Sequence, residues 1–555
     1  MNCLLALIGI IVWVVRQKQN DSADYFLGGR DATWLAIGAS IFASNIGSEH
    51  LIGLAGAGAS SGMAMAHWEI QGWMILILGW VFVPFYSRSM VYTMPEFLER
   101  RYNPQSRTIL SVISLVSYVL TKVAVTVYAG GLVFQQVFGI KELWGIDFFW
   151  IAAIGLVVLT ALYTIFGGMK SVLYTSVLQT PILLLGSLII LVLGFKELGG
   201  WDEMMRVCGA VTVNDYGDTM TNLIRSNDDA NFPWLGALIG SAIIGFWYWC
   251  TDQFIVQRVL SGKNEKEARR GTIFGAYLKL LPVFLFLIPG MIAFALHQKY
   301  IGAGGEGFLP MLANGTANAD AAFPTLVAKL LPAGVKGLVV CGILAALMSS
   351  LASLFNSSAM LFTIDFYKRF RPETPEKKLV GIGQIATVVI VILGILWIPI
   401  MRSVGDVLYT YLQDVQSVLA PGIAAAFLLG ICWKRTSAQG GMWGLIAGMI
   451  IGLTRLGAKV YYSNAGEVAD STFKYLFYDM NWLFFCGWMF LFCIIVVIVV
   501  SLATEAPTAE KIQGLVFGTA TKEQKAATRA SWDHWDIIHT VIILAITGAF
   551  YWYFW

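Results

Sequence analysis

A long series of apolar segments is the feature that most restricts what this chain can fold into. A helix that crosses the roughly 30 Å of a membrane interior needs about 20 mostly apolar residues. Hydrophobic residues make up 57% of the chain and charged residues only 13%, against about 25% charged in soluble domains. A soluble fold of this composition would expose more apolar surface than a monomer tolerates. We therefore expect an all-α polytopic membrane protein.

Fourteen candidate spans can be read from the sequence. They are 3–15, 33–57, 65–86, 108–137, 147–166, 171–195, 233–257, 272–297, 333–364, 378–401, 405–431, 438–458, 481–503 and 535–555. The first is short for a span, and it lacks the basic start and the cleavage site of a signal peptide. We expect it to be a spanning helix whose first turns are absent from this sequence.

Positive charges predict the orientation. With the N-terminus outside, most of the 37 Lys and Arg residues fall on the inner side, as the positive-inside rule requires. An odd number of spans would destroy this asymmetry, so we expect both termini outside. The net charge of +3 leaves no basic patch for nucleic acid, and the seven cysteines show no metal-binding spacing. Short termini and lean loops favour a bacterial inner membrane.

Ionisable side chains inside spans are costly, so each is a candidate for function. Glu49 and His50 lie in the segment GASIFASNIGSEHLIGLAGAGA at 38–59, whose small residues allow either close helix packing or a break near Asn45. A broken span frees backbone carbonyls, and transporters use such carbonyls to bind Na⁺. The further candidates of this kind are Glu69, Lys122, Asp252, Lys279 and Asp414.

Two further segments carry polar groups of another kind. In AALMSSLASLFNSSAML, Ala346, Ser349 and Ser350 share a helix face, and their oxygens suit a hard monovalent cation. Serine hydroxyls also commonly bond back to their own helix, which is the alternative. The run FWYWCTDQ at 246–253 sets aromatic faces beside hydrogen-bonding groups. This combination suits a sugar, whose ring has an apolar face and a rim of hydroxyls, although such rings also serve in packing or face lipid.

Two prolines predict irregular helices near polar side chains, because proline removes a backbone hydrogen bond. Pro282 closely follows Lys279, and Pro421 follows Gln413 and Gln416. We expect the helix to end or kink at both places.

These segments, in this order, resemble the sodium:solute symporter family, and within it the sodium/glucose cotransporters. The resemblance covers nearly the whole chain, and the order and spacing of its long motifs also fit. The motifs are DYFLGGRDATWLAIGASIFASNIGSEHLIGLAG, VYTMPEFLERRY, YTIFGGMKSVLYTSVLQ, YWCTDQFIVQRVLS, KGLVVCGILAALMSSLASLFNSSAMLFTIDFYKRF and LAPGIAAAFLLGICWKR.

The resemblance implies a LeuT-like fold, in which five core helices are followed by five more in inverted orientation. The spans that begin at 33 and 233 would then be the two discontinuous helices. The implied organisation is a leading helix and inner loop (1–32), the first repeat (33–195), an outer loop (196–232), the second repeat (233–431) and three further helices with an inner connector (432–555).

The resemblance also implies two sites. The family's main sodium site would use the carbonyls of Ala43, Ile46 and Ala346 and the hydroxyls of Ser349 and Ser350. The sugar would be bound by Asn45, His50, Glu69, Tyr248, Trp249, Lys279 and Gln413. The outer gates would be Leu54, Trp68 and Tyr409. Tyr248 would be the inner gate.

Some positions depart from the family pattern. Ser176 stands where many relatives have an aspartate that helps a second sodium site, and Ala352 lacks a hydroxyl found in such members. We therefore expect one Na⁺ per sugar. Gly245 and Gly72 lack polar side chains that some relatives contribute, so the preferred sugar hydroxyls are expected to differ.

The sequence thus predicts a cell-membrane symporter that couples inward Na⁺ movement to uptake of a glucose- or galactose-like sugar by alternating access. A single copy is expected to suffice for transport. Another solute of the family, such as inositol, an amino acid or a carboxylate, is the alternative. No motif of a hydrolase, metalloprotease or nucleotide-binding enzyme occurs, so we do not expect an enzyme.

Overall fold

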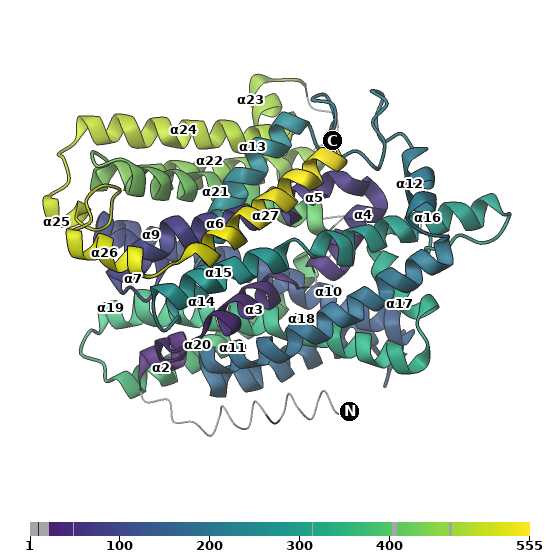
Figure 1. The fold of residues 1–555 in the computed structure, drawn as a ribbon, viewed down its shortest axis with the longest axis horizontal. Coiled ribbons are helices and arrows are strands. Elements are labelled where there is room, and N and C mark those ends of the chain that lie inside the picture. Colours follow the sequence, from purple (N-terminus) through teal and green to yellow (C-terminus); the bar gives the residue numbers. More distant parts are fainter. Residues whose placement is uncertain (1–8, 10–20, 48, 313–314, 402–407, 465–468) are drawn as a thin grey trace.

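The computed structural model describes residue 9 and residues 21–47, 49–312, 315–401, 408–464 and 469–555. In this part of the chain, ten helical stretches are long and apolar enough to cross a membrane, and two shorter apolar helices cover Trp34–Asn45 and Val125–Gln135. Figure 1 shows the long helices side by side, with α2, α19, α25 and α26 at the left end and α12 and α17 at the right. The predicted first span, 3–15, lies almost wholly outside the described residues.

The first half of the chain forms helices broken into short pieces around one long helix. Its elements are α2 (Ser22–Leu27), η1 (Gly28–Arg30), α3 (Trp34–Asn45), η2 (Glu49–Leu54), α4 (Ala55–Ser61), η3 (Gly62–Met65), α5 (Ala66–Glu69), α6 (Gly72–Ile77), η4 (Leu78–Phe82), α7 (Val83–Ser89), α8 (Met94–Arg101), α9 (Pro104–Ser117), η5 (Tyr118–Val123), α10 (Ala124–Phe138), the antiparallel pair β1 (Glu142–Leu143) and β2 (Ile146–Asp147), α11 (Phe148–Leu198) and α12 (Trp201–Gly209).

The second half continues in the same manner and ends in three long helices. Its elements are α13 (Trp234–Gly245), η6 (Phe246–Thr251), α14 (Gln253–Leu260), α15 (Glu265–Lys279), η7 (Val283–Leu287), α16 (Ile288–Gly302), η8 (Ala319–Ala321), α17 (Ala322–Leu330), α18 (Ala333–Met360), η9 (Leu361–Tyr367), α19 (Lys368–Phe370), α20 (Glu376–Met401), α21 (Leu408–Cys432), α22 (Ala438–Asn464), α23 (Thr472–Lys474), η10 (Tyr475–Asp479), α24 (Trp482–Ala503), α25 (Ala509–Ile512), α26 (Lys522–Ala530) and α27 (His534–Tyr553).

Two predicted spans follow each other without a loop. The spans 147–166 and 171–195 are two helical stretches of α11 that meet at a kink at Gly168 (φ 52°, ψ −147°). Residues with a side chain rarely adopt this conformation, so the glycine allows the sharp change of direction. Helix α11 packs along α18 and α3, and its second half contacts both through Ser176 and Thr180.

The prediction of an irregular helix at Pro421 is wrong. Helix α21 continues through Pro421 to Cys432. A Cβ at position 422 would stand 2.9 Å from the Gly448 Cα, so α21 and α22 approach each other backbone to backbone at this level. Such close packing is a means by which membrane helices accommodate an internal proline. The irregularity expected after Lys279 is confirmed, because α15 ends there and η7 begins at Val283.

Candidate functional site

The first predicted break is present at Asn45. Helix α3 ends there, and Ile46 has an extended backbone (φ −80°, ψ 92°) before the chain turns into the wide helical turn η2. The last carbonyls of a helix have no partner within it. Here the Asn45 carbonyl accepts from the Gly47 amide at 3.1 Å, and the Ser44 carbonyl accepts from the Ser350 hydroxyl at 3.1 Å. The carbonyls of Ala43 and Ile46 belong to the same stretch.

The second break lies at Asp252. The turn η6 ends at Thr251, Asp252 is extended (φ −76°, ψ 127°), and its carboxylate accepts from the Phe254 amide at the start of α14. An acidic residue is well suited to cap a helix start, where backbone amides lack partners. The helices that begin at residues 34 and 234 are therefore both discontinuous, as the sequence predicts.

A cavity of about 50 Å³ lies between the two breaks. All seven residues predicted to bind the sugar line it, together with Trp68 and Ser350. The other lining residues are Glu49, Gln71, Lys122, Val125, Thr126, Ile244, Gly245, Phe254, Leu354, Leu412 and Gln416. The structure thus brings the predicted binding residues together, while their role as ligands of a substrate stays a prediction.

A chain of polar contacts connects four elements in this cavity. Lys279 on α15 donates to the Glu69 carboxylate at 2.6 Å and to the Asn45 side-chain oxygen at 3.2 Å. His50 Nε2 lies 3.3 Å from the same Glu69 oxygen. The Asn45 amide in turn donates to the Tyr248 hydroxyl at 3.1 Å. Asn45 therefore ties the end of α3 to α15 and to η6, the element that carries the aromatic run.

The charges in this chain of contacts balance. Glu69 is fully buried and Lys279 is 3% exposed, and burial of an unpaired charge costs far more than burial of a pair. Lys279 also lies 5.4 Å from the centre of the Trp249 ring. Gln413 Oε1 is buried and has no hydrogen-bond partner within the described residues. The cavity therefore offers neutral hydrogen-bonding groups beside aromatic faces.

A second buried ion pair was not predicted. Lys122 on η5 lies 2.5 Å from the Asp252 carboxylate, and the Tyr118 hydroxyl donates to the same carboxylate. The Lys122 ammonium also lies 4.6 Å from the centre of the Tyr248 ring and 4.5 Å from that of Phe254. This pair joins η5 to the second helix break. Asp252 follows Tyr248, the predicted inner gate residue, by four positions in the sequence.

Two of the predicted outer gate residues, Trp68 and Leu54, are packed against other side chains. Trp68 stacks on Trp482 of α24, with ring centres 5.5 Å apart, and contacts Phe232 edge to face. Leu54 is fully buried but does not line the cavity. Tyr409 lies in α21, and its side chain is outside the described residues.

Ser350, one of the residues predicted to bind sodium, lies where the end of α3 packs against α18. Ser350 bonds the Ser44 carbonyl, and the Ser44 hydroxyl lies 2.6 Å from that of Ser353. Ser349 Oγ lies 3.2 Å from Ser176 Oγ on α11. Buried hydroxyls and backbone carbonyls from three helices thus converge, with Ala346 one turn before Ser349 and Ser350.

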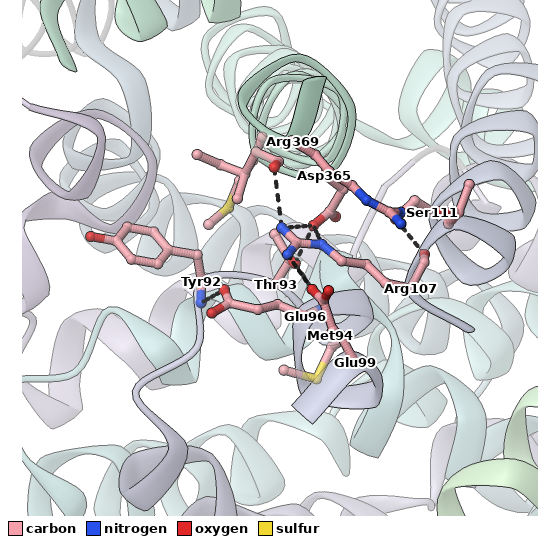
Figure 2. Close-up of polar contacts among 12 residues, drawn as sticks. Tyr92, Thr93, Met94, Glu96, Glu99, Arg107, Ser111, Asp365 and Arg369 are labelled. Atoms are coloured by element: carbon pink, nitrogen blue, oxygen red, sulfur yellow. Dashed lines mark hydrogen bonds and ion pairs between the residues drawn. The ribbon is translucent and has the colours of Figure 1, made fainter. Parts of the chain in front are cut away.

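A further polar cluster connects α8, α9, η9 and the start of α14 (Figure 2). Arg107 of α9 donates to Asp365 of η9 at 2.7 Å and to Glu99 of α8 at 2.6 Å. Thr93 Oγ1 donates to the same Asp365 oxygen at 2.9 Å. The next amide, that of Met94, donates to Gln253 at the start of α14. The start of α8 is therefore attached to η9 on one side and to α14 on the other.

Sequence reasoning missed several residues of the cavity. Lys122 and Glu49 were recognisable as charges within spans, and Gln416 by its spacing of three from Gln413. Gln71 has a weaker signal, since it is one uncharged residue in the run WEIQGW. Its place in the wall depends on a helix interruption that the sequence does not mark clearly.

Comparison with known proteins gives matches over most of the chain. The family model "Sodium:solute symporter family" matches residues 25–448. The human sodium/myo-inositol cotransporter 2 is 36% identical over 93% of this chain and 77% of its own length. The sodium/myo-inositol cotransporter of the dog, Canis lupus familiaris, is 37% identical over 90% of this chain and 72% of its own length.

A solved structure is also similar. It is the substrate-bound outward-open state of a Na⁺-coupled sialic acid symporter, with a TM-score of 0.71 at 22% identity, covering 91% of this chain and 97% of that chain. At this identity the likeness concerns the fold alone. The two cotransporters named above are mammalian, so the expected location in a bacterial inner membrane is not supported. The matches do support a multi-pass membrane protein.

Proposed function

This chain belongs to the sodium:solute symporter family and is a Na⁺-coupled solute symporter, and we propose that the solute is a neutral cyclic polyol. A cyclitol of the inositol type is the first candidate, and a hexose is the second. Both rings present an apolar face and several hydroxyls. The observation that carries the proposal is the cavity in which Glu69 pairs with Lys279 beside the rings of Tyr248 and Trp249.

Charge argues against anionic solutes. A carboxylate substrate requires an uncompensated cation, but Lys279 is already paired with Glu69 at 2.6 Å, and Lys122 with Asp252 at 2.5 Å. Amides and hydroxyls suit sugar or cyclitol hydroxyls, because they both donate and accept. Similarity favours the cyclitol, since two relatives at 36–37% identity are named sodium/myo-inositol cotransporters.

In this proposal one Na⁺ enters the oxygen cluster between α3 and α18, formed by Ala43, Ile46, Ala346, Ser349 and Ser350. Binding there would fix α3 relative to α18 and favour one orientation of the cavity. The ion would supply the driving force. At −100 mV an inward charge contributes about 2.3 kcal/mol, and a tenfold Na⁺ gradient adds about 1.4 kcal/mol. Together they support solute accumulation of several hundredfold.

The proposal places the two breaks in equivalent positions of two inverted repeats, 33–195 and 233–431. Each break would then serve a different ligand: the first the ion, and the second, through Tyr248, the solute. Tyr248 would leave its contact with Asn45 when the cavity opens toward the inside.

The test is uptake into proteoliposomes of the purified protein, with labelled myo-inositol and D-glucose in parallel. We expect uptake in a Na⁺ gradient and none when choline replaces Na⁺. A panel of unlabelled competitors should show inhibition by cyclitols and hexoses, and none by amino acids or monocarboxylates. Stronger competition by an amino acid or a carboxylate than by either polyol would contradict the proposed substrate class.

A further inference from the structure

Gln71 is a polar residue of the cavity wall to which the proposed function assigns no role. It lies where the helix is interrupted between α5, which ends at Glu69, and α6, which begins at Gly72. On a continuous helix, residues two apart point about 200° away from each other. Glu69 and Gln71 could then not both face one cavity. The interruption turns both toward it.

Gly245 on α13 makes room for the Gln71 side chain. The Gln71 amide nitrogen donates to the carbonyl of Ser241, one turn earlier on α13, at 2.8 Å. A Cβ at position 245 would stand 2.5 Å from Gln71 Oε1 and 2.9 Å from its Cδ. Both distances are shorter than a van der Waals contact. The amide of Gln71 therefore lies directly on the bare Cα of Gly245.

This arrangement fixes which way the amide faces. With Nε2 bound to the Ser241 carbonyl, the reverse orientation would set two acceptor oxygens against each other. An amide oxygen has two acceptor positions. Within the described residues, no donor is recorded for Gln71 Oε1, and the side chain is 97% buried in the cavity wall. The oxygen is thus a pre-oriented acceptor at the cavity.

We propose that Gln71 is a specificity-determining residue, whose Oε1 accepts a hydrogen bond from one hydroxyl of the polyol. The inference rests on the proposed function and deepens it. It also makes recognition at this wall a property of the pair Gln71 and Gly245, because the amide reaches its position only when residue 245 has no side chain.

The test measures Na⁺-dependent uptake of myo-inositol and D-glucose, each with its series of monodeoxy analogues, in proteoliposomes. The wild type should discriminate against several analogues, because several residues bind hydroxyls. Gln71→Leu should lose discrimination against one analogue, by about tenfold in relative KM, and keep it against the others. Tenfold corresponds to about 1.4 kcal/mol, the size of one hydrogen bond.

A second variant tests the same role of Gln71 by changing its partner Gly245. Gly245→Ala leaves Gln71 in the chain but displaces its amide, so it should lose discrimination against the same analogue. Gly487→Ala on α24 is the matched control, because its Cβ would meet only Ile239 at 3.4 Å, and its selectivity should equal that of the wild type. The two variants alter different residues, so either one decides the question if the other does not fold.

The outcomes separate the two proposals. Unchanged discrimination in the variants, with Na⁺-dependent uptake intact, would overturn the role of Gln71 alone. Equal loss of discrimination against every analogue would also overturn it, since that is the result of a general disturbance of the cavity. Failure of the wild type to take up either series in Na⁺ would overturn the proposed function, and the role of Gln71 with it.

Discussion

Replacing Lys122 with methionine should destabilise the protein more than replacing Lys122 and Asp252 together. The ammonium lies 2.5 Å from the Asp252 carboxylate, and the two side chains are 8% and 2% exposed. At an effective dielectric constant of about 20, unit charges at this distance attract by about 6–7 kcal/mol. Desolvation offsets much of this gain when both charges are present, but a single remaining charge keeps its full penalty, about 3–5 kcal/mol.

The double variant Lys122→Met with Asp252→Asn removes both charges. Asparagine is as good a helix cap as aspartate, so the bond from the Phe254 amide is retained, and its side-chain oxygen still accepts from Tyr118. We therefore expect the double variant to recover more than half of the stability that Lys122→Met loses.

The assay is thermal unfolding in detergent, followed by tryptophan fluorescence, for the wild type, both single variants and the double variant. A matched control pair is Lys263 with Asp31, which are 4.0 Å apart and 64% and 76% exposed. The same substitutions there should change stability by less than about 1 kcal/mol, because water already solvates both charges. If the double variant at 122 and 252 is as unstable as the sum of its single variants, the electrostatic reasoning is wrong.

Three other predictions concern separate parts of the molecule. Ser350→Ala should raise the Na⁺ concentration for half-maximal uptake by about tenfold, the size of one lost polar contact. Ser358→Ala should not, because its hydroxyl has no hydrogen-bond partner in the described part of the chain; equal shifts in both variants would contradict the sodium assignment. Gly168→Ala should cost about 1–3 kcal/mol of stability, because its backbone conformation (φ 52°) is strained for alanine, while Gly155→Ala in the same helix, with nothing within 4 Å of the added Cβ, should cost nothing measurable in the same melting assay. In the loop between α12 and α13, burial would raise the pKa of Asp229, but hydrogen bonds from Phe232, Asn214 and Asn231 and the charge of Arg225 hold that pKa below its ordinary value. Since the folded-state pKa is the lower one, Asp229 stabilises the fold above about pH 4, and this contribution is lost as the pH falls through the folded-state pKa. The melting temperature of the wild type should therefore fall more steeply below pH 4 than that of Asp229→Asn, and parallel curves would contradict this.

The helix breaks could be predicted because their causes are local. Residues 38–59 are small and polar where a span should be bulky and apolar, and Pro282 stands close behind Lys279. Both segments are interrupted in the structure. Pro421 carries the same local signal, yet α21 runs through it. Its outcome depends on α22, which packs closely at Gly422 and which no local pattern at Pro421 reveals.

Pairings across the fold could not be predicted, because they depend on how distant segments meet. Lys122 and Asp252 were each recognisable as charges within spans, but their sequence separation of 130 residues gives no sign that they form one pair. Gln71 was harder still. An uncharged side chain carries no marker of cost in a membrane segment, and its partner is a glycine, which contributes space and no chemistry.

The end of α3 has a consequence for genetics. The oxygens proposed for Na⁺ at Ala43 and Ile46 belong to the backbone, and no amino-acid replacement deletes a backbone carbonyl. A saturation mutagenesis screen should therefore find these two positions tolerant of changes in side-chain chemistry and intolerant of changes in bulk, since both are buried. Neutral variation at such positions in a population would say little about their importance, and sequence-based variant scores would underrate the backbone that surrounds them.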